Sequence, residues 1–235
     1  MKIRRLFSLF FCLVLALSLA APARAAADDV GDWEVEAKAA LLIDPDTEEI
    51  LYARNIHERL YPASLTKIMT CLLVLEAIDS KVIAMDTVLT ASEPAVTSIP
   101  PDGSTAGIQV GEELTVEELL YCIMLSSANE GCNILAEAVS GSIEAFVEKM
   151  NDKAAALKCE DTRFANTNGL PDPNHYTTAW DLYVITKEAR THPEFMPLVG
   201  TIYHEVPATN LSEARKLYTT NYLISSYRTS YYLYQ

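Results

Sequence analysis

The sequence predicts an α/β fold of the α+β type, in which a β hairpin near the start is followed by a helical lobe. Three observations support this class. Half of the 235 residues are hydrophobic and 21% are charged, which is an ordinary globular composition. Two short apolar runs near the start are separated by turn residues, and the middle of the chain carries helical apolar patterns with helix-start signals.

Residues 1–25 are typical of a secretory signal peptide. This segment has four basic residues and no acid, an apolar run over residues 6–21, and the small residues Ala23 and Ala25 before a cleavage point. The alternative is a membrane anchor, but the run is short for a spanning helix. We therefore expect a chain that is exported to the cell envelope, outside the cytoplasm, and that begins at Ala26.

The net charge and the cysteines indicate what the chain does not bind and whether it forms disulfides. Acids outnumber bases 32 to 18, and this net charge of −14 argues against a nucleic-acid partner. The four cysteines that follow the signal peptide could form two disulfides in an oxidising compartment. Each cysteine lies in or beside a helical apolar pattern, however, which favours buried free thiols. These cysteines are Cys71, Cys122, Cys132 and Cys159.

The elements follow in order along the chain. Ala37–Ile43 and Glu49–Asn55 read as two strands of a hairpin, joined by the turn residues Asp44 to Thr47. Thr115 and Glu118 form the pattern of a capping box, in which each residue caps the backbone of the other. Helices are expected at about 64–80, 115–125, 133–139, 143–157 and 180–189, with turn-rich or irregular segments at 88–111 and 163–178.

Ser64 and Lys67 are the first candidate catalytic residues. Their spacing of three places both side chains on one face of a helix, one turn apart. A lysine in a dry pocket can lose its proton and act as a base toward a serine nucleophile. The plain alternative is a helix cap followed by a surface charge. The residues after Lys67 are apolar on nearly every side of the helix, however, which indicates that the helix and its lysine are buried.

Ser127 and Asn129 are the second pair. They follow a buried apolar helix, and a hydroxyl and an amide two residues apart can project from a tight turn into one cleft. Ser127 could pass protons to and from Lys67, and Asn129 could hold Lys67 or a substrate amide. Alone, the triplet is also compatible with a simple polar loop.

Three stretches, in this order, resemble the motifs of the serine D-alanyl-D-alanine carboxypeptidases, which are low-molecular-mass penicillin-binding proteins. Residues 62–70 resemble the nucleophile motif, and Ser127 to Asn129 resemble the S-x-N motif. Residues 164–182 resemble the stretch F-x-N-P-x-G-L followed by H-x-S/T-T-A-x-D-L. The resemblance implies a DD-peptidase/β-lactamase-like fold, with an antiparallel sheet and a helical lobe, over residues 26–235.

The resemblance also implies an activity. Ser64 would attack the carbonyl of the penultimate D-alanine in a peptidoglycan stem peptide ending in D-Ala-D-Ala, and Lys67 would take its proton. Ser127 would relay a proton to the leaving amine, Asn129 would bind substrate, and β-lactams would acylate the same serine. It implies no metal and no cofactor, and no protein partner is identifiable.

One departure from the family pattern is serious. The family carries a third motif, K-T-G, on a strand facing the nucleophile, and this sequence has no lysine followed by Ser/Thr-Gly. We therefore expect a domain that is incomplete at its C-terminus, with only the two hairpin strands and an open, apolar sheet side. We also expect no measurable carboxypeptidase activity from residues 26–235 alone.

Two alternatives to the carboxypeptidase interpretation remain. A class A β-lactamase shares S-x-x-K but needs a deacylating glutamate in a loop, and Glu160 and Glu194 lack that local pattern. A non-catalytic peptidoglycan-binding or β-lactam-sensing protein would explain the missing K-T-G. The retention of both candidate pairs argues against this second alternative.

Overall fold

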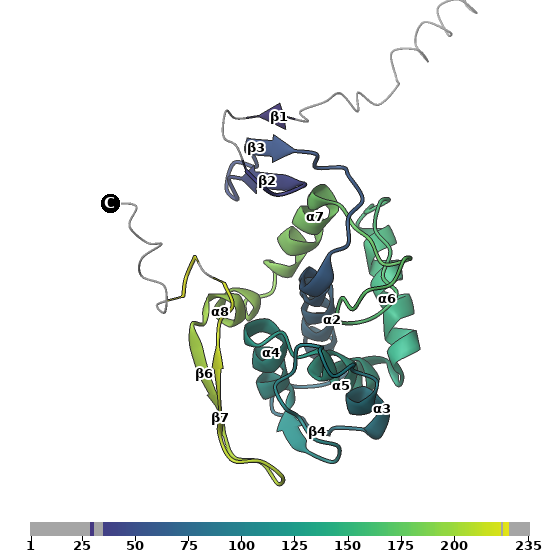
Figure 1. Ribbon diagram of the computed structural model, residues 1–235, viewed down its shortest axis with the longest axis vertical. Helices are drawn as coiled ribbons and strands as arrows, with labels where there is room; N and C mark the ends of the chain where they lie inside the picture. The colour runs from purple at the N-terminus through teal and green to yellow at the C-terminus, as the bar shows by residue number, and fades with distance from the viewer. Residues whose placement is uncertain (1–28, 31–34, 222, 226–235) are drawn as a thin grey trace, which may run out of the picture.

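A computed structural model of the chain describes residues 29–30, 35–221 and 223–225. The expected signal peptide and residues 226–235 lie outside these residues. A small sheet lies at one end of the molecule, and a helical lobe is built around one central helix, α2 (Figure 1). In the part of the chain that is described, no helix has the length and hydrophobicity needed to cross a bilayer.

The sheet has three antiparallel strands in the order β1-β3-β2. They are β1 (Asp29–Val30), β2 (Ala40–Ile43) and β3 (Ile50–Arg54). The predicted hairpin is therefore confirmed with shorter strands, and the Asp44 carboxylate closes its turn by accepting the N–H groups of Asp46 and Thr47 at 2.9 Å.

The expectation of only two strands in this sheet is wrong. The short β1 segment pairs with the far edge of β3, and two residues are too few to give a strand signal in the sequence. Leu42 and Leu51 are 46% and 43% exposed, in keeping with the apolar sheet surface that the sequence predicts.

The helical lobe contains one 3₁₀ helix and seven α-helices among the described residues. They are η1 (Ala63–Thr66), α2 (Lys67–Asp79), α3 (Glu93–Thr97), α4 (Val116–Leu125), α5 (Asn129–Ser140), α6 (Ile143–Ala156), α7 (Ala179–Ala189) and α8 (Phe195–Gly200). The five predicted helices are confirmed in place. Helix α5 begins four residues earlier than expected, and α3 and α8 were not predicted.

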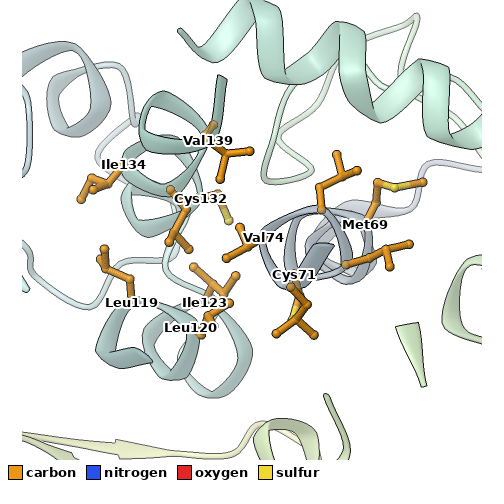
Figure 2. Packing of buried hydrophobic residues seen from close by; sticks show 14 of the residues in the cluster. Met69, Cys71, Val74, Leu119, Leu120, Ile123, Cys132, Ile134 and Val139 are labelled. Carbon is orange, nitrogen blue, oxygen red and sulfur yellow. The ribbon is translucent and has the colours of Figure 1, made fainter. Parts of the chain in front are cut away.

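Helix α2 is buried on nearly all sides, as its sequence predicts. Figure 2 shows Val74 of α2 facing Ile123 of α4 and Cys132 of α5, while Met69 lies on the other side of the helix. Helix α2 also contacts α6, α7 and α8. Because apolar burial is the main favourable term in folding, this central position holds α2 in place, and the catalytic candidates sit at its N-terminal end.

The start of this helix differs from the prediction. A regular helix was expected from Ser64, but residues 63–66 form a 3₁₀ turn, and the α-helix begins at Lys67. Such tighter turns are common at helix N-termini. Ser64 therefore lies in the 3₁₀ turn, while Lys67 is the first residue of α2.

Two further hairpins were not predicted. Strands β4 (Val88–Thr90) and β5 (Glu113–Thr115) pair with each other, as do β6 (Tyr203–Val206) and β7 (Arg215–Tyr218). The β6–β7 hairpin lies along one side of the lobe (Figure 1). It is tied there by an ion pair between Arg215 and the fully buried Glu112.

Two local expectations can be checked in the same region. Thr115 caps α4 by accepting the Glu118 N–H, but the Glu118 carboxylate lies 2.8 Å from His204 Nε2 instead of returning to Thr115. The capping box is therefore half confirmed. All four cysteines in the described chain are buried free thiols, as the apolar pattern predicts.

Candidate active site

Ser64 is held in place by an unusual backbone contact. Ala63, just before it, has a φ of +48°, a left-handed conformation that costs free energy for any residue with a side chain. Gly169 packs directly against the Ala63 carbonyl with a φ of +93°, and a Cβ atom at that position would overlap the carbonyl oxygen. A glycine is therefore required here, and it fixes the turn that presents Ser64.

Lys67 is buried and fully hydrogen-bonded. Its side chain is 2% exposed, and its ammonium donates to Asn129 Oδ1 at 2.8 Å, to the Asn168 carbonyl oxygen at 2.7 Å and to Ser64 Oγ at 3.4 Å. The buried position that the sequence predicts is confirmed.

Burial lowers the pKa of Lys67 below its ordinary value of 10.5, because the charged form is poorly solvated. The nearby Cys132 and Glu130 act in the opposite direction and are smaller effects. A larger fraction of Lys67 is therefore neutral at a given pH than for a lysine in water.

Ser127 and Asn129 each contact one member of the Ser64–Lys67 pair. The Ser127 hydroxyl donates to Ser64 Oγ at 2.8 Å, and Asn129 binds the Lys67 ammonium. Ser127 has a φ of +57°, so the turn between α4 and α5 is itself strained. All four residues named from the sequence come together in one site, and a tight turn after a buried helix was part of the expectation.

The segment 163–178 supplies groups that sequence reasoning did not assign a role. The Asn166 side chain accepts the backbone N–H groups of Asn168 and Gly169, forming a tight turn that directs the Asn168 carbonyl at Lys67. Thr70 of α2 donates to the Thr167 carbonyl at 2.5 Å, which binds the same turn to the helix.

His175 secures the other end of this segment. Its Nδ1 accepts the Ala165 N–H at 3.1 Å, so the ring proton lies on Nε2, which donates to Thr66 Oγ1 at 2.7 Å. Burial lowers the pKa of His175 to about 4, and the ring is therefore neutral at pH 7. The sequence offered one signal for this packing, the Gly-Leu and His-Tyr-Thr-Thr pattern of residues 169–178.

Ser64 opens into a cavity of about 550 Å³ with a largely apolar lining. The lining includes Ser127 and Met124 of the central lobe and Thr219 to Asn221, which follow the β6–β7 hairpin. A larger cavity of about 700 Å³ lies between α6 and residues 158–176, but it shares no lining residue with the site and contains no serine. The chemistry therefore assigns the smaller cavity as the candidate active site.

The arrangement is that of a serine nucleophile with a lysine as its base. Ser64 is exposed to the cavity, a lysine with a lowered pKa contacts its hydroxyl, and a second serine hydroxyl completes the site. Such a site can carry out acyl transfer, in which the serine forms and then releases an ester.

Comparison with known proteins gives the family. The sequence profile of the D-alanyl-D-alanine carboxypeptidases matches residues 23–231. The chain therefore belongs to this family of serine peptidases.

Two curated relatives show how much of a family member this chain spans. The carboxypeptidase DacF of Bacillus subtilis is 39% identical over 226 residues, which are 95% of this chain and 57% of DacF. The carboxypeptidase DacD of Escherichia coli is 35% identical over 69% of this chain and 43% of its own length. The chain thus spans about half the length of the curated relatives that it matches.

Solved structures agree on the fold. The carboxypeptidase DacD from Francisella tularensis superimposes with a TM-score of 0.72 at 30% identity, covering 83% of this chain and 48% of that one. Penicillin binding protein 5 from Haemophilus influenzae gives a TM-score of 0.73 at 29% identity, covering 81% and 54%. The expected DD-peptidase fold is confirmed.

Proposed function

We propose that this chain carries the catalytic serine and lysine of an enzyme that removes the terminal D-alanine from peptidoglycan stem peptides ending in D-Ala-D-Ala, through an acyl-enzyme on Ser64. The observation that carries the proposal is the buried Lys67, whose amino group joins Ser64 to Asn129 and to the Asn168 carbonyl. Family membership and the names of the carboxypeptidase relatives support the same reaction. β-Lactams, which resemble an acyl donor, would acylate the same serine.

The proton count at Lys67 explains how it would act as the base. An ammonium has three N–H donors, and here they point at two carbonyl oxygens and at Ser64 Oγ. After losing one proton, the amine keeps two N–H donors for the two carbonyl oxygens. Its lone pair then faces the Ser64 hydroxyl, which is the arrangement that a general base needs.

Ser127 would donate a proton to the amine that leaves during acylation. When Ser64 attacks the carbonyl carbon of the penultimate residue, the C–N bond to the terminal D-alanine breaks and the leaving amine needs a proton. The Ser127 hydroxyl, 2.8 Å from Ser64 Oγ, is within reach of that amine and can receive a replacement proton from Lys67. The Ser64 backbone N–H is the proposed donor to the oxyanion, and water then releases the shortened peptide.

Export to the cell envelope is part of the proposal. The substrate class is a cell-wall peptide, and residues 1–25 have the pattern of a secretory signal. Sequencing the N-terminus of the protein recovered from cells should give Ala26 as the first residue. An intact Met1 on the mature protein would contradict export by cleavage.

Release of D-alanine tests the function. A version extended to the length of the relatives, so that it contains a K-T-G strand, should release D-alanine from a D-Ala-D-Ala peptide and lose this activity in the Ser64→Ala variant. Residues 26–235 contain no K-T-G sequence, so we expect this polypeptide alone to release none, since the loss of one oxyanion donor is worth about 10²–10³ in rate. An extended version that binds labelled penicillin but releases no D-alanine would favour a β-lactam-sensing role instead.

A further inference from the structure

Glu130 is a buried carboxylate next to the site that the proposed mechanism does not use. It is the second residue of α5, directly after Asn129, and it is 2% exposed. A buried carboxylate is costly unless something binds it, and its surroundings therefore indicate what it does.

Among the described residues, the hydrogen bonds of the Glu130 carboxylate go to one neighbouring segment, residues 103–108, which we term the 103–108 loop. Its Oε1 accepts the Thr105 hydroxyl at 2.6 Å, the Ala106 N–H at 2.8 Å and the Ile108 N–H at 3.3 Å. Its Oε2 is also buried, and within the described residues it has no hydrogen-bond partner. One oxygen atom therefore makes every contact.

The same loop touches Asn129 in two places. The Ser104 carbonyl accepts the Asn129 N–H at 3.0 Å. A Cβ atom added to Gly103 would lie 3.1 Å from Asn129 Nδ2, so the loop backbone passes close to that side chain. Asn129 Oδ1 in turn accepts from Lys67 at 2.8 Å.

We propose that Glu130 is a positioning residue for the reaction: it holds the 103–108 loop against Asn129 and thereby fixes the amide that orients Lys67. This inference rests on the function proposed above. Arg215 of β7 binds the other backbone group of the same residue by donating to the Ala106 carbonyl at 3.2 Å. The Ala106 residue is thus held from α5 on its N–H side and from the hairpin on its carbonyl side.

Because Oε1 makes all three contacts, two variants can separate the role of these hydrogen bonds from the role of the charge. In Glu130→Gln the amide oxygen can replace Oε1 and keep all three hydrogen bonds, while the charge is lost. In Glu130→Ala the loop loses all three. Glu137→Ala is the matched control, because Glu137 lies two turns further along α5 and its carboxylate binds Ser92, outside the site.

The first measurement is amide hydrogen exchange, which does not depend on activity. The Ala106 and Ile108 amides should exchange about tenfold faster or more in Glu130→Ala, and near the wild-type rate in Glu130→Gln and Glu137→Ala. Unchanged protection of both amides in Glu130→Ala would overturn the inference.

The second measurement is the rate of acylation by a fluorescent penicillin in the extended version. Glu130→Ala should acylate about 10–100-fold more slowly, since a displacement of about 1 Å near reacting groups can cost 10²-fold. Glu130→Gln should be rescued to within about threefold of wild type, which a role of the charge would not allow. A Gln variant as slow as the Ala variant would refute positioning through the loop.

If Glu130→Ala fails to fold, a further variant still tests the inference. Gly103→Ala leaves Glu130 intact and adds a methyl group 3.1 Å from Asn129 Nδ2 and 2.8 Å from Ile99 Cγ2. It should also slow acylation by about tenfold or more, and wild-type acylation in this variant would contradict the inference. Absence of acylation in wild type would instead contradict the proposed function, while the exchange result would still decide the role of Glu130 in the loop.

Discussion

The surroundings of Lys67 set its pKa and the direction of its amino group. Burial lowers its pKa, and two carbonyl oxygens and one serine hydroxyl hold its amino group. The burial follows from the sequence, because the helix after Lys67 is apolar on nearly every side. The contact with the Asn168 carbonyl could not be predicted in this way, because a backbone carbonyl leaves no side-chain signature and a distant turn sets its direction.

The Lys67→Arg variant tests the base. Arginine keeps the positive charge but does not deprotonate at accessible pH, so acylation of Ser64 by penicillin should fall by about 10²-fold or more. Stopped-flow fluorescence in the extended version measures this rate. Acylation near the wild-type rate would show that another group takes the Ser64 proton.

The Gly169→Ala variant tests the contact that positions Ser64. It should lower the free energy of unfolding by at least about 2 kcal/mol, because the new Cβ would overlap the Ala63 carbonyl at a residue whose φ is +93°. Urea denaturation measures this change. Gly141→Ala is the control, since Gly141 has a similar φ of +80° but no atom within 4 Å of the added Cβ. Equal losses in both variants would mean that backbone strain alone accounts for the effect.

Among the helices and strands, hydrophobic periodicity and capping signals predicted the longer elements. The helix after Thr115, the helix over residues 143–157 and the first hairpin lie where the sequence places them. The missed strands are two to four residues long, and contacts with distant segments hold them in place. The β6–β7 hairpin is an example, because its partner Glu112 lies about a hundred residues before Arg215.

The Glu112→Ala variant tests how the β6–β7 hairpin is held. Glu112 is fully buried and accepts from Arg215, from Thr209 Oγ1 at 2.8 Å and from the Gln109 N–H at 2.9 Å. Its removal leaves a mostly buried Arg215 charge without its carboxylate, which should cost about 3–5 kcal/mol of unfolding free energy.

The control for this variant is an exposed ion pair. Lys187→Ala breaks the Lys187–Glu48 pair, whose side chains are about half exposed, and it should cost far less stability than Glu112→Ala, because water screens an exposed pair. Chemical denaturation compares the two variants. A loss in Glu112→Ala no larger than that in Lys187→Ala would contradict the anchoring role.

At the scale of the whole molecule, the site depends on segments that are far apart in sequence. The turn at 166–169 meets α2 about a hundred residues earlier, and His175 reaches Thr66 across a similar separation. Motif order predicted that these segments belong together, but the individual contacts needed the fold. The stability of the domain should therefore respond to the charge state of His175.

Stability should fall as the pH is lowered from about 6.5 to 4. The pKa of His175 is about 4 in the folded chain and 6.5 in its ordinary state, so the unfolded chain binds more protons in this window. The contribution is fully present above pH 6.5 and is lost as the pH falls, with a slope of up to about 1.4 kcal/mol per pH unit. Urea denaturation at several pH values should show a smaller slope in His175→Gln, and an equal slope would contradict this assignment.

Ser64 is the proposed nucleophile of this site. The most direct test is mass spectrometry of the extended version after incubation with benzylpenicillin, followed by tryptic peptide mapping. We predict a single penicilloyl group on the peptide that ends at Lys67, attached to Ser64, and no adduct in Ser64→Ala. An adduct that survives in Ser64→Ala, or that maps to Ser127 or any other residue, would contradict the claim.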